Sequence, residues 1–130
     1  MTRRSPLSTA AAAAATLATA VPAAADVTLI NVFEIPPGQE ERVITAWEKA
    51  RDFLKEEPGY VTTALHRAVS PNARFALVNV ATWESPEAFM VATKRMQDAN
   101  IFPDIEGLGV NPALYRIVRR DDGASSPSEN

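Results

Sequence analysis

The stretch ARFALVNVATWESPEAF, residues 73–89, predicts a buried β-strand that runs directly into an α-helix. Strand residues alternate between two faces, and one face here carries Phe75, Leu77, Asn79, Ala81 and Trp83. The intervening residues are also largely apolar, so both faces of the sheet are expected to be covered. Ser85 is a preferred N-cap residue, Pro86 suits the first helical position, and Glu87 adds negative charge to the first turn. The helix is therefore predicted to begin at this corner.

Two polar groups, the amide of Asn79 and the indole of Trp83, interrupt the apolar face of this strand. They are roughly 13 Å apart at ~3.3 Å per residue. Burying an amide without a hydrogen bond costs ~1–3 kcal/mol, and the same argument applies to Asn31, which shares a face with Leu29 and Phe33. These three polar residues are candidate site residues. The alternative is structural, with the amides bonded to a loop or a dimer contact and the indole N–H bonded to a carbonyl.

The rest of the chain continues the same alternation of strands and helices. Strands are predicted at 27–35, 60–67, 74–82 and 113–118, and helices at 39–55 and 86–97. A turn at 70–72 makes a hairpin of the second and third strands, and residues 100–111 are predicted to be irregular. The order β-α-β-β-α-β predicts an α+β protein of the ferredoxin-like arrangement.

The two ends of the chain are predicted to lie outside this domain. Arg3 and Arg4, an apolar run over 7–21 and a small-residue site at 23–25 predict an export signal over residues 1–25, by the general or the twin-arginine route. Residues 26–120 would form one domain, and the polar tail at 121–130 is expected to be disordered. The sequence thus predicts a periplasmic or secreted protein.

Composition excludes several classes of function. Removing residues 1–25 takes away two arginines and no acidic residue, so the formal charge changes from −3 to −5. An acidic domain without a basic run is a poor match for nucleic acid or an anionic membrane surface. The chain has one histidine and no cysteine, and it has none of the common nucleotide, flavin or metal motifs, so no cofactor is predicted. A domain this small buries little surface, so a homodimer that packs sheet against sheet is expected.

Seven short motifs, in order along residues 27–118, give the chain a family resemblance. They are Pro37-Gly38-Gln39-Glu40-Glu41 before a helix with Trp47-Glu48, then Pro58-Gly59-Tyr60, Leu65-His66-Arg67, Ala73-Arg74-Phe75, Asn79-x-x-x-Trp83-Glu84-Ser85 and Pro112-Ala113-Leu114-Tyr115. With these motifs the chain resembles the antibiotic biosynthesis monooxygenase family of dimeric α+β barrels. That resemblance implies a ferredoxin-like domain that completes a barrel with a second copy.

The resemblance also implies a reaction, because the family contains cofactor-independent oxygenases that convert polycyclic phenols and anthrones to quinones with dioxygen. Asn79, Trp83 and Asn31 match the pocket residues of those enzymes. Neutral N–H donors of this kind can stabilise a substrate oxyanion in a water-poor pocket, and removing one such donor typically costs on the order of 10²–10³ in rate. His66 is a candidate general base for deprotonating the substrate, although exposure or a salt bridge near Arg67 is an equally natural role.

A second branch of the same fold degrades haem, using an asparagine, a tryptophan and a histidine ligand. Asn31 matches the first, but Ala92 and Phe102 stand near the other two positions, so haem degradation of that type is not expected. The alternative to an oxygenase is a small-ligand or haem-binding module without turnover. A third hypothesis is signalling, or detoxification of an exported quinone or aldehyde.

Overall fold

The computed structural model describes residues 26–123 and contains four strands and two helices. In chain order these elements are β1 (Val27–Glu34), α1 (Glu40–Leu54), β2 (Tyr60–Arg67), β3 (Leu77–Trp83), α2 (Pro86–Asp98) and β4 (Gly109–Tyr115). This is the predicted β-α-β-β-α-β order, so the ferredoxin-like fold is confirmed. The predicted export signal, and the predicted disordered tail beyond residue 123, lie outside the described residues.

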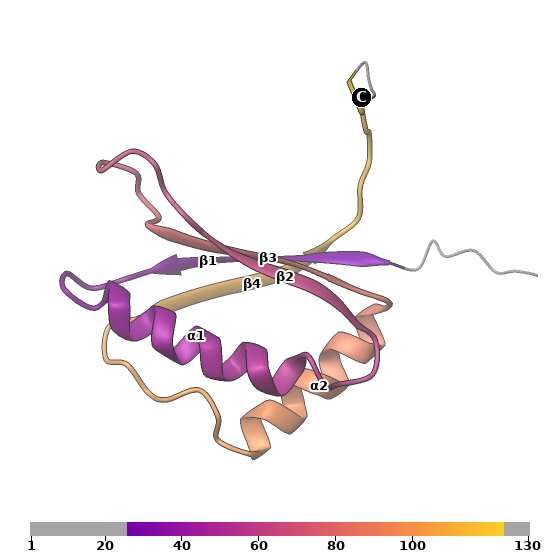
Figure 1. Ribbon diagram of the computed structural model, residues 1–130, viewed down its shortest axis with the longest axis horizontal. Helices are drawn as coiled ribbons and strands as arrows, with labels where there is room; N and C mark the ends of the chain where they lie inside the picture. Colours follow the sequence, from indigo (N-terminus) through magenta and orange to yellow (C-terminus); the bar gives the residue numbers. More distant parts are fainter. Residues whose placement is uncertain (1–25, 124–130) are drawn as a thin grey trace, which may run out of the picture.

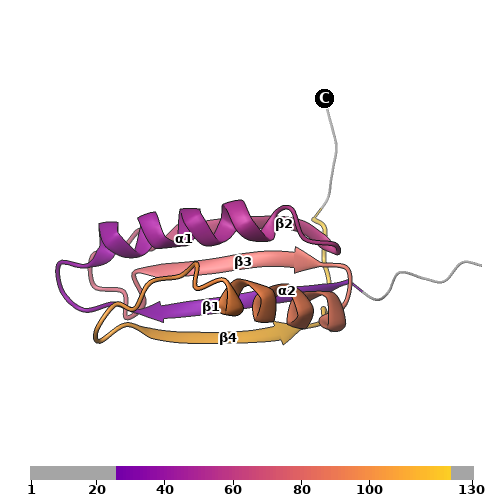
Figure 2. The same cartoon turned by 90° about the horizontal axis from the view of Figure 1, so that it is seen from below.

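The four strands form one antiparallel sheet in the order β2-β3-β1-β4, in which β2 and β3 are a hairpin and β1 lies between β3 and β4. Figure 1 shows both helices on the same side of this sheet, and Figure 2 shows β4, β1 and β3 side by side, with the helices in front of the sheet. Strand β3 therefore lies in the interior of the sheet, as its apolar sequence predicted. Among residues 26–123 no helix has the length and apolar character needed to span a membrane.

The corner between β3 and α2 forms as its sequence predicted. The side chain of Ser85 accepts a hydrogen bond from the backbone N–H of Ala88 at 3.0 Å, and Pro86 occupies the first turn. Trp83, the last residue of β3, is only 1% exposed. A good N-cap is worth about 1 kcal/mol, so the turn itself helps to fix where α2 begins.

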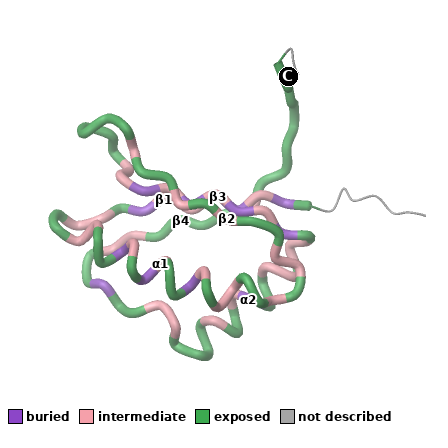
Figure 3. The backbone as a smooth tube through the Cα atoms, viewed as in Figure 1, coloured by how far each residue is buried: buried purple, intermediate pink, exposed green. Residues whose placement is uncertain are grey.

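The hydrophobic core consists of two clusters at opposite ends of the sheet, and each joins strand residues to residues of a helix. Figure 3 shows the buried segments in purple on the strands and on α1. One contains the buried residues Val27, Leu29, Ala81, Trp83 and Ala92. The other contains Phe33, Val43, Ala46, Leu77 and Ile105. Between the two clusters lies the row of the sheet that holds Asn31 and Asn79. The apolar packing of the domain is therefore interrupted at its centre.

The last strand differs from its prediction. It runs from Gly109 to Tyr115 rather than over residues 113–118, so the irregular stretch ends earlier than expected. Gly109, Asn111 and Pro112 have the composition of a loop, but Pro112 lies on an edge strand, where a missing N–H is tolerated. Side-chain bonds from β1 and from Asn111 itself support the pairing here. Strand β3 also starts later than predicted, at Leu77, because β2 pairs with it only as far as Arg67.

One face of the sheet has no helix against it, and we call it the open sheet face. Its centre consists of four half-buried aliphatic residues paired across β1 and β3, namely Ile30, Val32, Val78 and Val80. Figure 1 shows the β2–β3 loop and the segment after β4 rising on this same side of the sheet. The single chain covers one face only, so the expected burial of both faces is not achieved within it.

Candidate functional site

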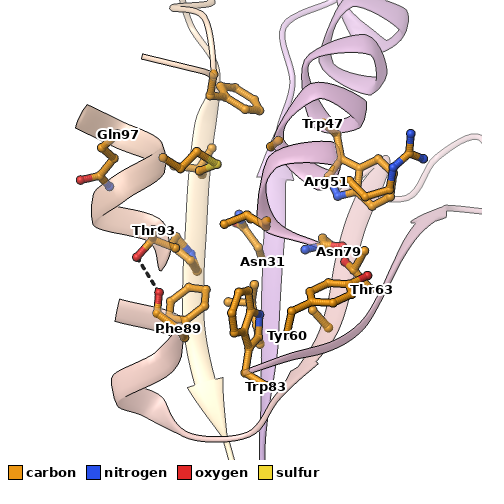
Figure 4. Close-up of a pocket in the computed structure, with 18 of the residues that line it drawn as sticks. Asn31, Trp47, Arg51, Tyr60, Thr63, Asn79, Trp83, Phe89, Thr93 and Gln97 are labelled. Carbon is orange, nitrogen blue, oxygen red and sulfur yellow. Dashed lines mark hydrogen bonds between the residues drawn. The ribbon is translucent and has the colours of Figure 1, made fainter. Parts of the chain in front are cut away.

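A cavity of about 440 Å³ lies between the helices and the sheet, over the gap between the two core clusters. Its volume falls within the ~300–1,000 Å³ typical of small-molecule sites. Aromatic side chains from several elements line it, namely Phe33, Trp47, Tyr60, Trp83, Phe89 and Phe102. The polar groups that line it are few: Asn31, Arg51, Thr63, Asn79, Thr93 and Gln97, with the hydroxyl of Tyr60 (Figure 4). Such a space suits a flat, largely apolar molecule that carries a few polar atoms.

Asn31 and Asn79 are direct partners across β1 and β3, on the helix side of the sheet. Side chains of opposed strand residues have Cβ atoms roughly 4.5–5.5 Å apart, so the two amides lie next to each other. Both residues line the cavity. The structure thus brings together two of the predicted site residues, from strands that are far apart in sequence.

The amide of Asn79 is held from the β2 side. Asn79 is 8% exposed, and its Oδ1 accepts a hydrogen bond of 2.8 Å from the hydroxyl of Thr63. An amide has a carbonyl that accepts and an NH2 that donates, and this bond occupies the carbonyl. The NH2 of Asn79 is therefore the end available to the cavity.

The amide of Asn31 is held from the opposite side of the sheet. Its Oδ1 accepts a hydrogen bond of 2.9 Å from the backbone N–H of Asn111 in β4. This bond is structural, which was the alternative to a functional role for Asn31 in the sequence analysis, since it supports the pairing of β1 with β4 beside Pro112. It also leaves the NH2 of Asn31 free to donate. Both amides are thus anchored outward through their carbonyls, which places two donors at the centre of the sheet.

Trp83 forms one end of the cavity and belongs to the core as well. Its ring meets Tyr60 edge-on, with centroids 5.7 Å apart, and Phe89 edge-on at 5.6 Å. Edge-to-face aromatic pairs of this kind add about 0.5–1.5 kcal/mol beyond the burial of apolar area. The predicted site residue is therefore at the cavity, and it is also a packing residue.

Tyr60 and Thr63 reach the cavity although neither was predicted as a site residue. Three positions separate them, so a regular strand would place them on opposite faces. The pairing of β2 with β3 shifts between Tyr60 and Thr62, which marks a β-bulge and puts both on the helix side. A sequence pattern does not reveal such a bulge, because a bulge depends on pairing with another strand.

Arg51 is a further cavity residue that sequence analysis missed. It follows Trp47 by four positions on α1, and its guanidinium lies 5.3 Å from the centre of the Trp47 ring. Its Nη2 also lies 3.1 Å from Oδ1 of Asp52, and its side chain is 37% exposed. The sequence signal that could have identified Arg51 is its spacing of four residues from Trp47, which places both side chains on the same face of α1. Arg51 supplies the one formal charge among the described residues that line the cavity, and Trp47 lines the cavity too.

His66 is not brought to the cavity. It pairs with Val78, so it points to the open sheet face, and it is exposed. Its neighbour Arg67 forms ion pairs of 2.6 Å with Glu40 and 2.9 Å with Glu41. The hydrogen bond to Glu40, and the charges of both carboxylates, raise the pKa of Arg67 above its ordinary value. The geometry therefore separates His66 from the other three candidate residues.

The site offers little to a metal or a haem iron. Within residues 26–123, no cluster of three or more acidic or histidine side chains is placed to hold a metal ion. Phe102 lines the cavity where the resemblance placed a haem-ligating histidine, and Ala92 is buried in the core. The one histidine of the chain lies on the other face of the sheet. Histidine-ligated haem does not fit these residues.

Comparisons with known proteins identify the family of the chain. The family model described as antibiotic biosynthesis monooxygenase matches residues 26–97. A solved structure from Shewanella loihica PV-4, described as a candidate monooxygenase, is 44% identical, with a TM-score of 0.68 over 74% of this chain and 97% of that one. No curated protein sequence matches the chain.

Two more distant structures share the fold. SnoaB, a cofactor-independent oxygenase from Streptomyces nogalater, is 21% identical, with a TM-score of 0.61 over 78% of this chain and all of its own. The haem degrader MhuD from Mycobacterium tuberculosis, with two haems bound, is 22% identical, with a TM-score of 0.57 over 73% of this chain and 98% of its own. The match to the family model and the 44% identical relative support a monooxygenase. The chain belongs to the antibiotic biosynthesis monooxygenase family.

Proposed function

We propose that this protein is a cofactor-independent monooxygenase that oxidises an aromatic phenol or anthrone with dioxygen to a quinone. The observation that carries the proposal is the pair of amides, Asn31 and Asn79, whose carbonyls are anchored outward beside an aromatic-walled cavity. The aromatic walls would hold a flat ring system. The two NH2 groups would donate to the oxygen atom on which negative charge develops.

The reaction balances without a further reductant. For an anthrone, two C–H bonds at the methylene carbon break and one C=O bond forms there. One oxygen atom of dioxygen enters the product, and the other leaves as water with the two hydrogens. The deprotonated substrate supplies the electrons, so the task left to the protein is to bind and stabilise that anion.

The cavity supplies no carboxylate or imidazole to remove the substrate proton. Arg51 and Tyr60 are the only ionisable side chains among the described residues that line it. In the proposed reaction, solvent removes the substrate proton. The amides of Asn31 and Asn79 stabilise the anion that remains. A donor aimed at a developing oxyanion in such a site is worth on the order of 10²–10³ in rate.

Oxygen uptake by the purified chain tests the proposal, with no metal or flavin added, over a panel of anthrones and dihydroxynaphthalenes. We expect uptake above the spontaneous rate with quinone as product, and a loss of most of this rate in N79A. The absence of uptake over the whole panel would contradict the proposal.

The second candidate function is a small-ligand or haem-binding module without turnover. The lack of a general base in the cavity wall favours it, because a binder needs none. Saturable binding of an aromatic ligand or haem, with no oxygen uptake, would support this candidate. Histidine-independent haem binding would be needed, since Phe102 stands at the expected ligand position.

We also propose that the protein works as an exported homodimer. The aliphatic centre of the open sheet face and the two segments that rise beside it support a partner copy there (Figure 1). Sedimentation of the purified chain as a monomer would contradict the dimer.

The sequence of residues 1–25 supports export to the periplasm or medium, and recovery of uncleaved protein from the cytoplasm alone would contradict it.

A further inference from the structure

Thr63 occupies a specific place beside the pair of amides. It lies on β2, on the helix side of the sheet, and it lines the cavity. Strand β3 separates β2 from β1, so Asn79 has Thr63 on one side and Asn31 on the other (Figure 4). The 2.8 Å bond from the Thr63 hydroxyl to Oδ1 of Asn79 therefore pulls the carbonyl of the amide away from Asn31.

The two ends of an asparagine amide have nearly the same size, so packing alone does not fix which end faces the cavity. A hydroxyl has one proton, and the hydroxyl of Thr63 donates it in the hydrogen bond to Oδ1 of Asn79. Turning the amide over would let its NH2 donate to the hydroxyl oxygen instead, but the hydroxyl proton would lose its acceptor Oδ1 of Asn79 and the carbonyl would face the cavity. A carbonyl oxygen would repel an anionic substrate where the NH2 attracts it.

We propose that Thr63 is a positioning residue that fixes the Asn79 amide with its NH2 directed to the substrate oxyanion. This inference rests on the proposed function for the meaning of the oxyanion, but the hold on the amide is a property of the protein itself. Thr63 acts through Asn79, and it is not among the four candidate residues that the sequence predicted.

The chain offers a matched set of variants to test this role. T63V removes the hydroxyl and keeps the size and the β-branched shape. T63S restores the hydroxyl. T62V makes the same change one residue earlier, where the side chain is exposed and points to the open sheet face.

With an anthrone as substrate, we expect T63V to lower kcat by on the order of 10-fold or more with a smaller change in KM, because a misdirected donor costs mainly transition-state stabilisation. T63S should recover most of kcat, and T62V should match the unchanged chain. An equal fall in kcat for T63V and T62V, or no rescue by T63S, would overturn the inference. Normal kcat in T63V would overturn it while leaving the proposed function intact.

A second measurement decides the matter if the unchanged chain shows no turnover. The side-chain NH2 signals of Asn79 are followed by NMR as the anion of a dihydroxyanthraquinone is added. A shift of these signals in the unchanged chain and in T63S, but not in T63V, would support the positioning role even though the proposed reaction had failed. The same shift in T63V, or none in the unchanged chain, would overturn it.

Discussion

The turn at Gly59 sets how closely α2 can approach the sheet, and the substitution G59A tests this. Gly59 has a φ of +89°, and a Cβ built there would overlap the Cβ of Ala88 on α2 and would lie 3.9 Å from Cε3 of Trp83. Two costs follow. A side chain in the left-handed region costs about 1–2 kcal/mol, and overpacking a tight contact costs about 1–3 kcal/mol.

Gly38 provides the control, because its φ is +81° and a Cβ there would meet nothing within 4 Å. G38A therefore carries the backbone cost alone, about 1–2 kcal/mol, whereas G59A should cost about 2–5 kcal/mol. Both variants gain about 0.4–1 kcal/mol from the stiffer unfolded chain, which cancels in the comparison. The difference between the two isolates the contact with α2.

Urea unfolding followed by tryptophan fluorescence measures both free energies. The double variant G59A/A88G removes the methyl group that would be overlapped. The loss of unfolding free energy in the double variant should be about 1–3 kcal/mol smaller than the sum of the losses in G59A and A88G, because the overpacking cost is then absent. Equal losses for G59A and G38A, or additive effects in the double variant, would refute the proposed close contact between this turn and α2.

Three further predictions concern the helix start and the cavity. S85A should lower the free energy of unfolding by about 1 kcal/mol through loss of the N-cap, and an unchanged urea midpoint would contradict this. R51M should weaken binding of an acidic aromatic ligand about five-fold or less relative to a neutral one, since an exposed ion pair is worth ~1 kcal/mol at most; equal affinities before and after in a fluorescence titration would argue against that role. H66Q should leave the rate of oxygen uptake unchanged because His66 lies off the cavity, and a marked loss of rate would place the imidazole back in the reaction.

The sequence predicted the β3–α2 corner well because its signals are local. The alternation around Asn79, the N-cap at Ser85 and the proline that follows each act within a few residues. The same alternation grouped Asn79 with Leu77 and Ala81, and the structure puts that face on the helix side of the sheet, where Asn79 lies opposite Asn31 on β1. The site residues chosen as polar interruptions of apolar strands are therefore at the cavity.

Features that depend on pairing between strands could not be predicted from local signals in the sequence. The bulge in β2 puts Tyr60 on the same side of the sheet as Thr63, and it exists only in the register with β3. Strand β4 was placed too late because Pro112 and Asn111 have loop composition, while bonds to β1 hold them in the sheet. Residue type suggested a base at His66, but only the register shows which face it occupies.

In the proposed reaction, two anchored amides stabilise a substrate anion that reacts directly with dioxygen. The most direct test supplies isotopically labelled dioxygen and an anthrone to the purified chain, without metal or flavin, and follows labelled quinone by mass spectrometry. We predict one labelled oxygen atom per quinone at a rate well above the spontaneous reaction. We also predict a fall on the order of 10²–10³ in N79A and a comparable loss in N31A. Labelled product formed at the same rate with and without these amides would contradict the proposed reaction.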